Sequence, residues 1–172
     1  MRKWSQLLAV LALLAAVPAA HASTLFIANL DGAQEPSAST ATGYGTVVLN
    51  DAMTMITVDE SWTGLIGGPA TASHIHGAAP PGANAPVLFP FAGVPAATSG
   101  SIPEQTFAIT PTQVGWLQSG LLYFNIHDAQ FPGGEIRGQI YAAVPDAGTL
   151  PLVAAGLVAL AAVGTVSRRS RA

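Results

Sequence analysis

A candidate β-hairpin near the end of the chain constrains the fold more than any other stretch. Residues 121–141 read LLYFNIHDAQFPGGEIRGQIY, two β-like runs on either side of a Pro-Gly-Gly turn. In the first run Leu122, Phe124 and Ile126 alternate with polar residues, which is typical of a strand that buries one face. The pattern predicts two antiparallel strands, and with them a β-rich domain.

Short β-like runs recur along the rest of the chain between Gly, Pro, Asn and Asp turns. In one of them Ile56, Val58 and Trp62 fall at period-two positions, and Pro90 interrupts another, which is expected to be an edge strand. The sequence predicts an all-β fold, an antiparallel β-sandwich or barrel of about seven to nine short strands. The expected strands are residues 24–30, 45–50, 53–62, 72–76, 87–91, 105–109, 121–127 and 135–141.

One short helix is expected within this β-rich chain, over residues 111–119. Thr110 can cap it, Pro111 suits the first helical position, and Gln113 completes a Thr-x-x-Gln capping box. Gly120 then suits the left-handed conformation that ends many helices.

The first 22 residues have the three parts of a secretory signal peptide. Arg2 and Lys3 form a positive segment, residues 7–17 are apolar, and Ala20-His21-Ala22 gives a small-x-small cleavage pattern. We expect signal peptidase to cleave after Ala22. The alternative is a signal anchor that is never cut.

Residues 144–172 have a second tripartite pattern. A breaker-rich motif precedes an apolar stretch at 150–166, which would be about 25 Å long as a helix and predicts a C-terminal membrane helix. The arginines at 168–171 should stay cytoplasmic, so the residues before the apolar stretch should lie outside. The alternative to a removable signal is a permanent C-terminal anchor. The motif residues are Val144, Pro145, Asp146 and Gly148.

The middle of the chain, residues 23–143, is long enough for one domain but not for two cores. Its charge is strongly acidic, because Arg137 is its only basic residue and the net charge is −7. This balance argues against nucleic-acid binding and against a polybasic lipid-binding surface. The chain has no cysteine, which excludes a thiol nucleophile and a thiolate metal site. The acidic residues are Asp31, Glu35, Asp51, Asp59, Glu60, Glu104, Asp128 and Glu135.

Three histidines form a candidate metal site. His74 and His76 lie two residues apart on one expected strand and therefore point to the same face, and His127 ends another expected strand. Three imidazoles with an open position would suit Zn or Cu, and Asp128 or Glu135 could supply an oxygen ligand. The alternative is that the histidines only form hydrogen bonds within the sheet or to the 77–86 loop.

The polar face of the hairpin is expected to form a structural polar network. A symmetric turn would pair His127 with Glu135, Asn125 with Arg137, and Tyr123 with Gln139. Arg137 beside Glu135 is interpreted as a hydrogen-bonded pair that fixes the hairpin register, with a ligand-binding role as the alternative. The network residues are Asn125, Glu135, Arg137 and Gln139.

No catalytic residue is assigned. The chain lacks a Gly-x-Ser-x-Gly elbow and a phosphate-cradling glycine loop. Asp59 and Glu60 are adjacent on an expected strand and project to opposite faces, which does not suit a glycosidase pair. A protein without enzymatic activity is favoured.

Two families resemble parts of this chain. Residues 30–36, 74–78 with 81–82, and 121–141 resemble the CHRD domain, which occurs as a repeat in chordin and singly in exported bacterial proteins. The resemblance implies a β-rich extracellular module with no well-established enzymatic activity. The tail resembles the Val-Pro-Asp variant of the PEP-CTERM bacterial sorting signal, which implies recognition by an exosortase-type membrane protease. Asp146-Ala147 stands where the commonest form has Glu-Pro.

Together these features predict an exported cell-surface or extracellular-matrix protein, transiently anchored in the inner membrane, with a non-enzymatic binding or structural role. A matrix or cell-envelope partner is expected. The alternative function is a Cu or Zn protein, or a metalloenzyme, that uses His74, His76 and His127.

Overall fold

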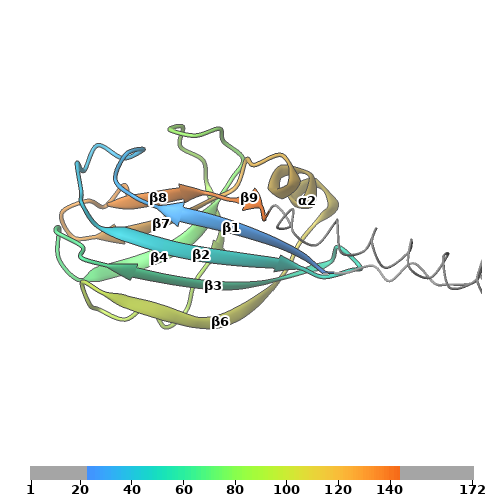
Figure 1. Cartoon of the computed structure of the whole chain (residues 1–172), viewed down its shortest axis with the longest axis horizontal. Coiled ribbons are helices and arrows are strands. Elements are labelled where there is room, and N and C mark those ends of the chain that lie inside the picture. The colour runs from blue at the N-terminus through green and yellow to red at the C-terminus, as the bar shows by residue number, and fades with distance from the viewer. Residues whose placement is uncertain (1–22, 144–172) are drawn as a thin grey trace, which may run out of the picture. The chain divides into compact units, whose positions relative to one another are not determined.

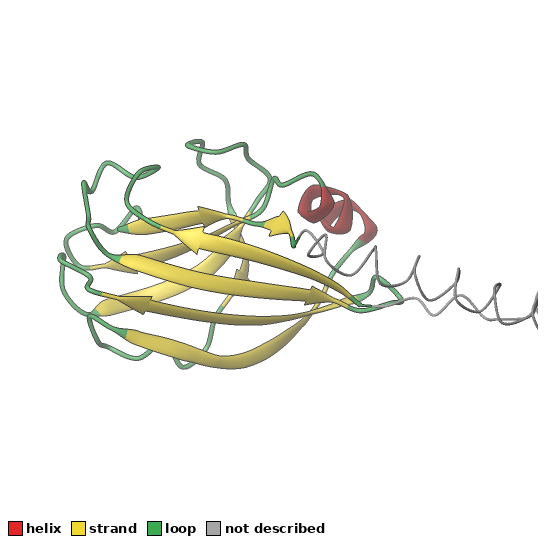
Figure 2. Ribbon diagram, viewed as in Figure 1, coloured by secondary structure: helices red, strands yellow, loops and turns green. Residues whose placement is uncertain are grey.

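The computed structural model describes residues 23–143. Nine strands form two facing β-sheets, and one short helix lies beside them (Figures 1 and 2). This arrangement confirms the predicted all-β antiparallel architecture with a short helix. The strands are β1 (Thr24–Leu30), β2 (Thr42–Leu49), β3 (Met55–Thr63), β4 (Ala70–His76), β5 (Val87–Pro90), β6 (Gly100–Ala108), β7 (Tyr123–Asp128), β8 (Ile136–Gln139) and β9 (Tyr141–Ala142). The helix is α2 (Pro111–Gln118).

All strand pairs in the two sheets are antiparallel. One sheet has the order β6-β3-β2-β1-β9 and the other has the order β5-β4-β7-β8. As expected from Pro90, β5 lies at an edge, where a missing backbone N–H leaves no gap in the ladder.

The hydrophobic core fills the space between the two sheets. Ile56, Val58 and Trp62 of β3 are buried, as their period-two spacing predicted. Gly45 of β2 allows the aromatic ring of Phe124 to pack directly against the backbone, since a Cβ at Gly45 would lie only 2.7 Å from that ring. The core residues that face this space include Phe26, Val47, Ile75, Ile102, Phe124, Ile126 and Ile136.

Helix α2 begins with the expected capping box. The backbone N–H of Gln113 donates to Thr110 Oγ1 at 3.3 Å, and the backbone N–H of Thr110 donates to Gln113 Oε1 at 2.9 Å. Pro111 occupies the first turn, and Gly120 follows the helix with a positive φ of 69°. Val114 and Leu117 bury the inner side of the helix.

The last strand differs from its prediction. The sequence predicted one strand over residues 135–141, but β8 ends at Gln139 and β9 pairs with β1 in the other sheet. Ile140, which is fully buried, lies at the crossing point between the sheets. The backbone pairing of Asp31 with Arg137 also joins β1 to β8, so the two sheets are connected along this edge. The alternation of buried and exposed residues does not reveal this change of sheet, because the same alternation continues on both sides of Ile140.

The signal peptide at 1–22, the sorting motif and the apolar segment at 150–166 lie outside the described residues. Within residues 23–143 no helix is long and apolar enough to cross a membrane.

Candidate metal centre

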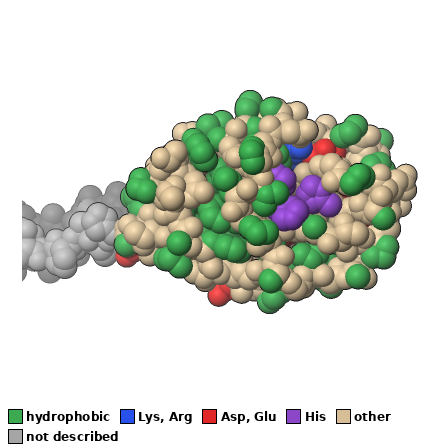
Figure 3. All heavy atoms as spheres, turned by 180° about the vertical axis from the view of Figure 1, so that it is seen from behind, with side chains coloured by type: hydrophobic (Ala, Val, Ile, Leu, Met, Phe, Trp, Pro, Cys, Tyr) green, Lys and Arg blue, Asp and Glu red, His purple; other side chains and the backbone are tan. Residues whose placement is uncertain are grey.

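The three histidines come from two neighbouring strands. His74 and His76 lie on β4 and His127 lies on β7, and these strands pair antiparallel with His74 opposite Asn125 and His76 opposite Tyr123. All three side chains project from the face of this sheet that is turned away from the core. Figure 3 shows histidine side chains gathered at the molecular surface, beside a basic and an acidic group.

The three imidazoles converge on one point. Each residue offers one ring nitrogen, and these nitrogens all lie within 4.8 Å of one another. The ring centroids are 5.0 Å apart for His74 and His127, 5.5 Å for His74 and His76, and 5.7 Å for His76 and His127. The expectation that a shared strand face would bring these rings together is confirmed.

Backbone carbonyls orient two of the three rings. Nδ1 of His76 lies 2.9 Å from the carbonyl oxygen of Ala85, and Nδ1 of His127 lies 3.0 Å from that of Pro132. Because a carbonyl oxygen only accepts hydrogen bonds, each Nδ1 carries the proton and each Nε2 keeps a free lone pair. Nε2 of His76, Nε2 of His127 and Nδ1 of His74 are all buried without a hydrogen-bond partner.

All three imidazoles have a lowered pKa, chiefly because burial disfavours the charged form. The pKa of His127 falls to about 4, although its hydrogen bond to Pro132 acts in the opposite direction. The pKa of His74 is lowered further by the charge of His76. Near neutral pH the cluster therefore holds three uncharged imidazoles, the form that binds metals.

The donor set fits a transition metal ion. Unpartnered buried polar atoms are costly, and three of them aimed at one point suggest a missing partner. Around an ion at about 2.0–2.1 Å per ligand, tetrahedral nitrogens would be about 3.4 Å apart. A shift of roughly 1 Å in the rings would close the present separation to that value.

The expected carboxylate ligands do not join the cluster. Asp128 Oδ1 accepts hydrogen bonds of 2.8 Å from the backbone of Gln130 and of Phe131. Glu135 accepts from Ser39 and from the backbone of the 66–67 segment. The suggestion that Asp128 or Glu135 supplies an oxygen ligand is wrong, because both carboxyl groups fix loops on the other side of β7.

Asp128 and Glu135 instead shift each other's pKa in opposite directions. Burial and the hydrogen bond with Glu135 raise the pKa of Asp128. For Glu135 burial acts in the same direction, but hydrogen bonds from Asp128, Ser39 and the 66–67 backbone outweigh it and lower its pKa.

Arg137 is buried and paired, but its partner is Glu35 and not Glu135. Arg137 Nε donates to Glu35 Oε1 at 2.5 Å, Nη1 donates to the carbonyl of Ala83 at 2.9 Å, and Nη2 donates to Asn84 Oδ1 at 2.6 Å. Burial raises the pKa of Glu35, and the charge of Arg137 and its hydrogen bond offset this in part. The predicted Arg137–Glu135 pair is therefore wrong, since the acceptor comes from the loop after β1.

Arg137 is linked to the cluster through Tyr123. Its guanidinium lies 4.2 Å from the centre of the Tyr123 ring, and that ring stacks on His76 at 5.0 Å. The backbone N–H of Ala85 donates to the Tyr123 hydroxyl at 3.0 Å, next to the carbonyl that holds His76. Arg137 and Tyr123 together secure the 83–85 segment that orients His76.

The predicted polar network forms only in part. Asn125 pairs with Arg137 and Tyr123 pairs with Gln139 in register as predicted, but the ladder ends at Ile126 and does not reach the expected His127–Glu135 pair. The four side chains bind separate loops and not one another. Asn125 donates to the carbonyl of Gly133, and Gln139 donates to the carbonyls of Ala79 and Gly120.

One buried acid was missed by the sequence interpretation. Glu60 of β3 is fully buried between the sheets, and its Oε2 lies 2.5 Å from Ser73 Oγ. Burial raises its pKa to about 8, partly offset by the Ser73 hydrogen bond. A protonated Glu60 can donate to Ser73, which frees the Ser73 hydrogen for the carbonyl of Asn125 at 3.2 Å. The alternation along β3 could have identified it, because Glu60 lies two residues from both Val58 and Trp62 and therefore points to the same buried face.

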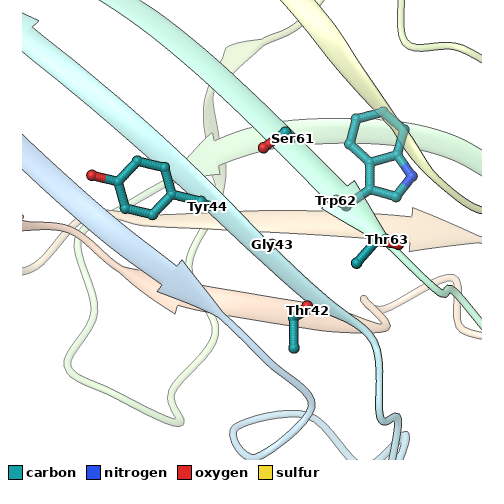
Figure 4. Close-up of a pocket in the computed structure, with 6 residues that line it drawn as sticks. All are labelled: Thr42, Gly43, Tyr44, Ser61, Trp62 and Thr63. Atoms are coloured by element: carbon teal, nitrogen blue, oxygen red, sulfur yellow. The ribbon is translucent and has the colours of Figure 1, made fainter.

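A separate pocket of about 260 Å³ lies on the five-stranded sheet (Figure 4). It offers hydroxyl and aromatic groups but no histidine or carboxylate, so it does not contribute to the metal centre. Its lining residues are Thr42, Gly43, Tyr44, Ser61, Trp62 and Thr63.

The fold and the cluster define an all-β sandwich that carries a three-histidine centre on the outer face of one sheet. The CHRD domain family matches residues 26–140, more than half of the chain, so this protein belongs to the CHRD domain family. No curated protein and no solved structure matches it.

Proposed function

We propose that this CHRD-domain protein binds one Zn²⁺ or Cu²⁺ ion through His74, His76 and His127, as a binding module of an exported surface or matrix protein. One observation carries the proposal: three buried imidazole nitrogens, one from each residue, face one another without a hydrogen-bond partner. Binding of the ion needs only these three side chains, so the proposed role requires no catalytic residue.

Two features of the site favour tight binding. The carbonyls of Ala85 and Pro132 fix the tautomers of His76 and His127, so these rings need little reorganisation. Imidazole ligands suit both copper and zinc, and copper should bind more tightly in the general order of divalent ions.

The proposed location outside the cell rests on the terminal signals. Cleavage after Ala22 by signal peptidase, followed by recognition of residues 144–172 by an exosortase-type protease, would release the β domain at the surface. The absence of cysteine and the acidic balance are compatible with a role in the extracellular matrix. A matrix or cell-envelope partner would bind the exposed surface of the β domain.

Calorimetric titration of the metal-free full chain tests the proposal. We expect one Cu²⁺ or Zn²⁺ per chain in the wild type and a loss of at least roughly 100-fold in affinity in His74→Ala and His127→Ala, because outer-shell contacts alone are worth roughly 10–100-fold. Glu104→Gln, which changes an exposed residue on β6, is the matched control and should bind as the wild type does. Equal affinity in the wild type and in both histidine variants would contradict the proposal.

A further inference from the structure

We infer that the ion in this three-histidine centre keeps an open coordination position directed away from the sheet, and that this position takes a small monoanion. The inference rests on the proposed metal binding and adds the class of ligand that the bound ion would receive.

The first argument is the direction from which the ligands approach. His74 and His76 lie on one strand and His127 lies on its neighbour, and all three rings leave the same face of the sheet. Their centroids form a nearly equilateral triangle with sides of 5.0–5.7 Å. An ion held by such a triangle has β4 and β7 beneath it, so a fourth ligand can approach only from the outer side.

The second argument is that the outer side is accessible. His74 is half-buried, and His76 and His127 keep 8% and 9% of their residue surface exposed. The space-filling view shows histidine side chains at the surface with no segment drawn over them (Figure 3). A small ligand could therefore reach the ion without unfolding a loop.

The third argument is that no carboxylate among the described residues joins the three histidines. Among residues 23–143 the cluster contains three histidines and no carboxylate. Asp128 and Glu135 are engaged with loops, and Glu35 is engaged with Arg137. Each of these acids would have to give up its hydrogen bonds to reach the ion.

The fourth argument concerns charge. Imidazole binds a metal through a neutral nitrogen lone pair, so three histidines leave the full charge of a divalent ion uncompensated in a half-buried site. The nearby cation Arg137 is already paired with Glu35. A monoanion at the open position would reduce the charge of the centre, so it should bind in preference to a neutral molecule of the same size.

Azide provides a spectroscopic probe of this position. The full chain is loaded with one Cu²⁺, and sodium azide is added while the azide-to-copper charge-transfer absorption is recorded. We expect a saturable band with one azide per copper and no such band with the copper-free protein. Sedimentation velocity of the copper-loaded protein should give the same species with and without azide.

Three results would overturn the inference. Tight binding of one copper that azide does not perturb would show a filled coordination sphere and overturn this inference alone. Dimerisation caused by copper that azide does not reverse would show that a side chain of a second copy fills the position. Absence of any copper binding would overturn both this inference and the proposed function.

Discussion

Two ionisable side chains of this domain are almost completely buried, Arg137 on the outer face of one sheet and Glu60 between the two sheets. Arg137 is 1% exposed and Glu60 is fully buried, yet each has specific polar contacts. The sequence pointed to Arg137 because it is the only cation of residues 23–143, but its partner could not be predicted. The pairing of β7 with β8 joins neighbours in the chain, whereas the contact with Glu35 spans 102 positions.

Replacement of Arg137 should destabilise the fold and weaken the metal site. Arg137→Ala leaves the buried side chain of Glu35 without its donor, which should lower the free energy of unfolding by roughly 3–5 kcal/mol. Arg137→Lys should recover only part of this, because one ammonium cannot replace a planar group with three contacts. Thermal melts measure the stability.

The same variants separate the two roles of Arg137. Zinc titration of Arg137→Lys, performed below its melting transition, should show affinity reduced by roughly 10–100-fold because the 83–85 segment no longer fixes His76. Unchanged stability and unchanged affinity in Arg137→Ala would show that the buried contacts contribute neither to folding nor to the site.

Glu60 should make the stability of the domain fall as the pH rises. A raised pKa means that the folded state keeps a proton that the unfolded chain loses above its ordinary pKa of 4.5. The free energy of unfolding is therefore fully retained below pH 4.5 and decreases until the pH passes about 8. Glu60→Gln cannot ionise, so at pH 9 it should exceed the wild type by on the order of 3–5 kcal/mol.

Urea denaturation at pH 5 and pH 9 measures this difference. At pH 5 the two proteins should have similar stability, since the side-chain amide introduced by Glu60→Gln can still donate to Ser73. Glu104→Gln removes an exposed carboxyl by the same chemical change and should leave the pH profile of the wild type intact. A pH-independent gap between the wild type and Glu60→Gln would rule out titration as its cause.

At the scale of elements, local signals predicted more than non-local ones. The capping box of α2 and the alternation of β3 each lie within a few residues, and the structure confirms them. For β7 the sequence predicted a strand that buries one face, but all six of its residues are buried. The strand β6 starts at Gly100, five positions before the predicted start, and β8 and β9 separate where one strand was expected. These differences arise from contacts with distant strands, β3 in the first case and β1 in the second.

Two glycines in different elements should respond in opposite ways to alanine. Gly45→Ala places a Cβ 2.7 Å from the fully buried Phe124 ring, so the sheets must separate locally, at a cost of about 1–3 kcal/mol. Gly115→Ala adds a methyl group at an exposed helical position with no atom within 4 Å, and should raise stability by about 0.5–1 kcal/mol. Guanidinium unfolding compares the two. An unchanged free energy of unfolding in Gly45→Ala would mean that the Phe124 ring can move within the core to make room for the methyl group.

At the scale of the whole molecule, the sequence predicted the members of the histidine cluster but not the groups that orient it. Strand parity placed His74, His76 and His127 on one face, and the pairing of β4 with β7 completed the triangle. The carbonyls of Ala85 and Pro132 belong to loops whose paths no periodic pattern encodes. The loop that sets the tautomer of His76 is held by long-range contacts of Arg137 with Ala83 and Asn84.

The two ends of the chain predict that the mature protein is shorter than its gene product. Residues 7–17 are apolar behind Arg2 and Lys3, and residues 150–166 are apolar before the terminal arginines, so each end has the charge asymmetry that directs membrane insertion. Mass spectrometry of the surface-exposed protein should find Ser23 as the first residue and no peptide from the 168–171 arginine segment. Replacing Pro145 and Asp146 with alanine should leave the N-terminal cleavage intact and retain the arginines, because only the sorting motif is changed. Recovery of the arginine tail from the surface-exposed wild-type protein would instead favour a permanent anchor, which needs nothing beyond the apolar segment to hold the domain at the membrane.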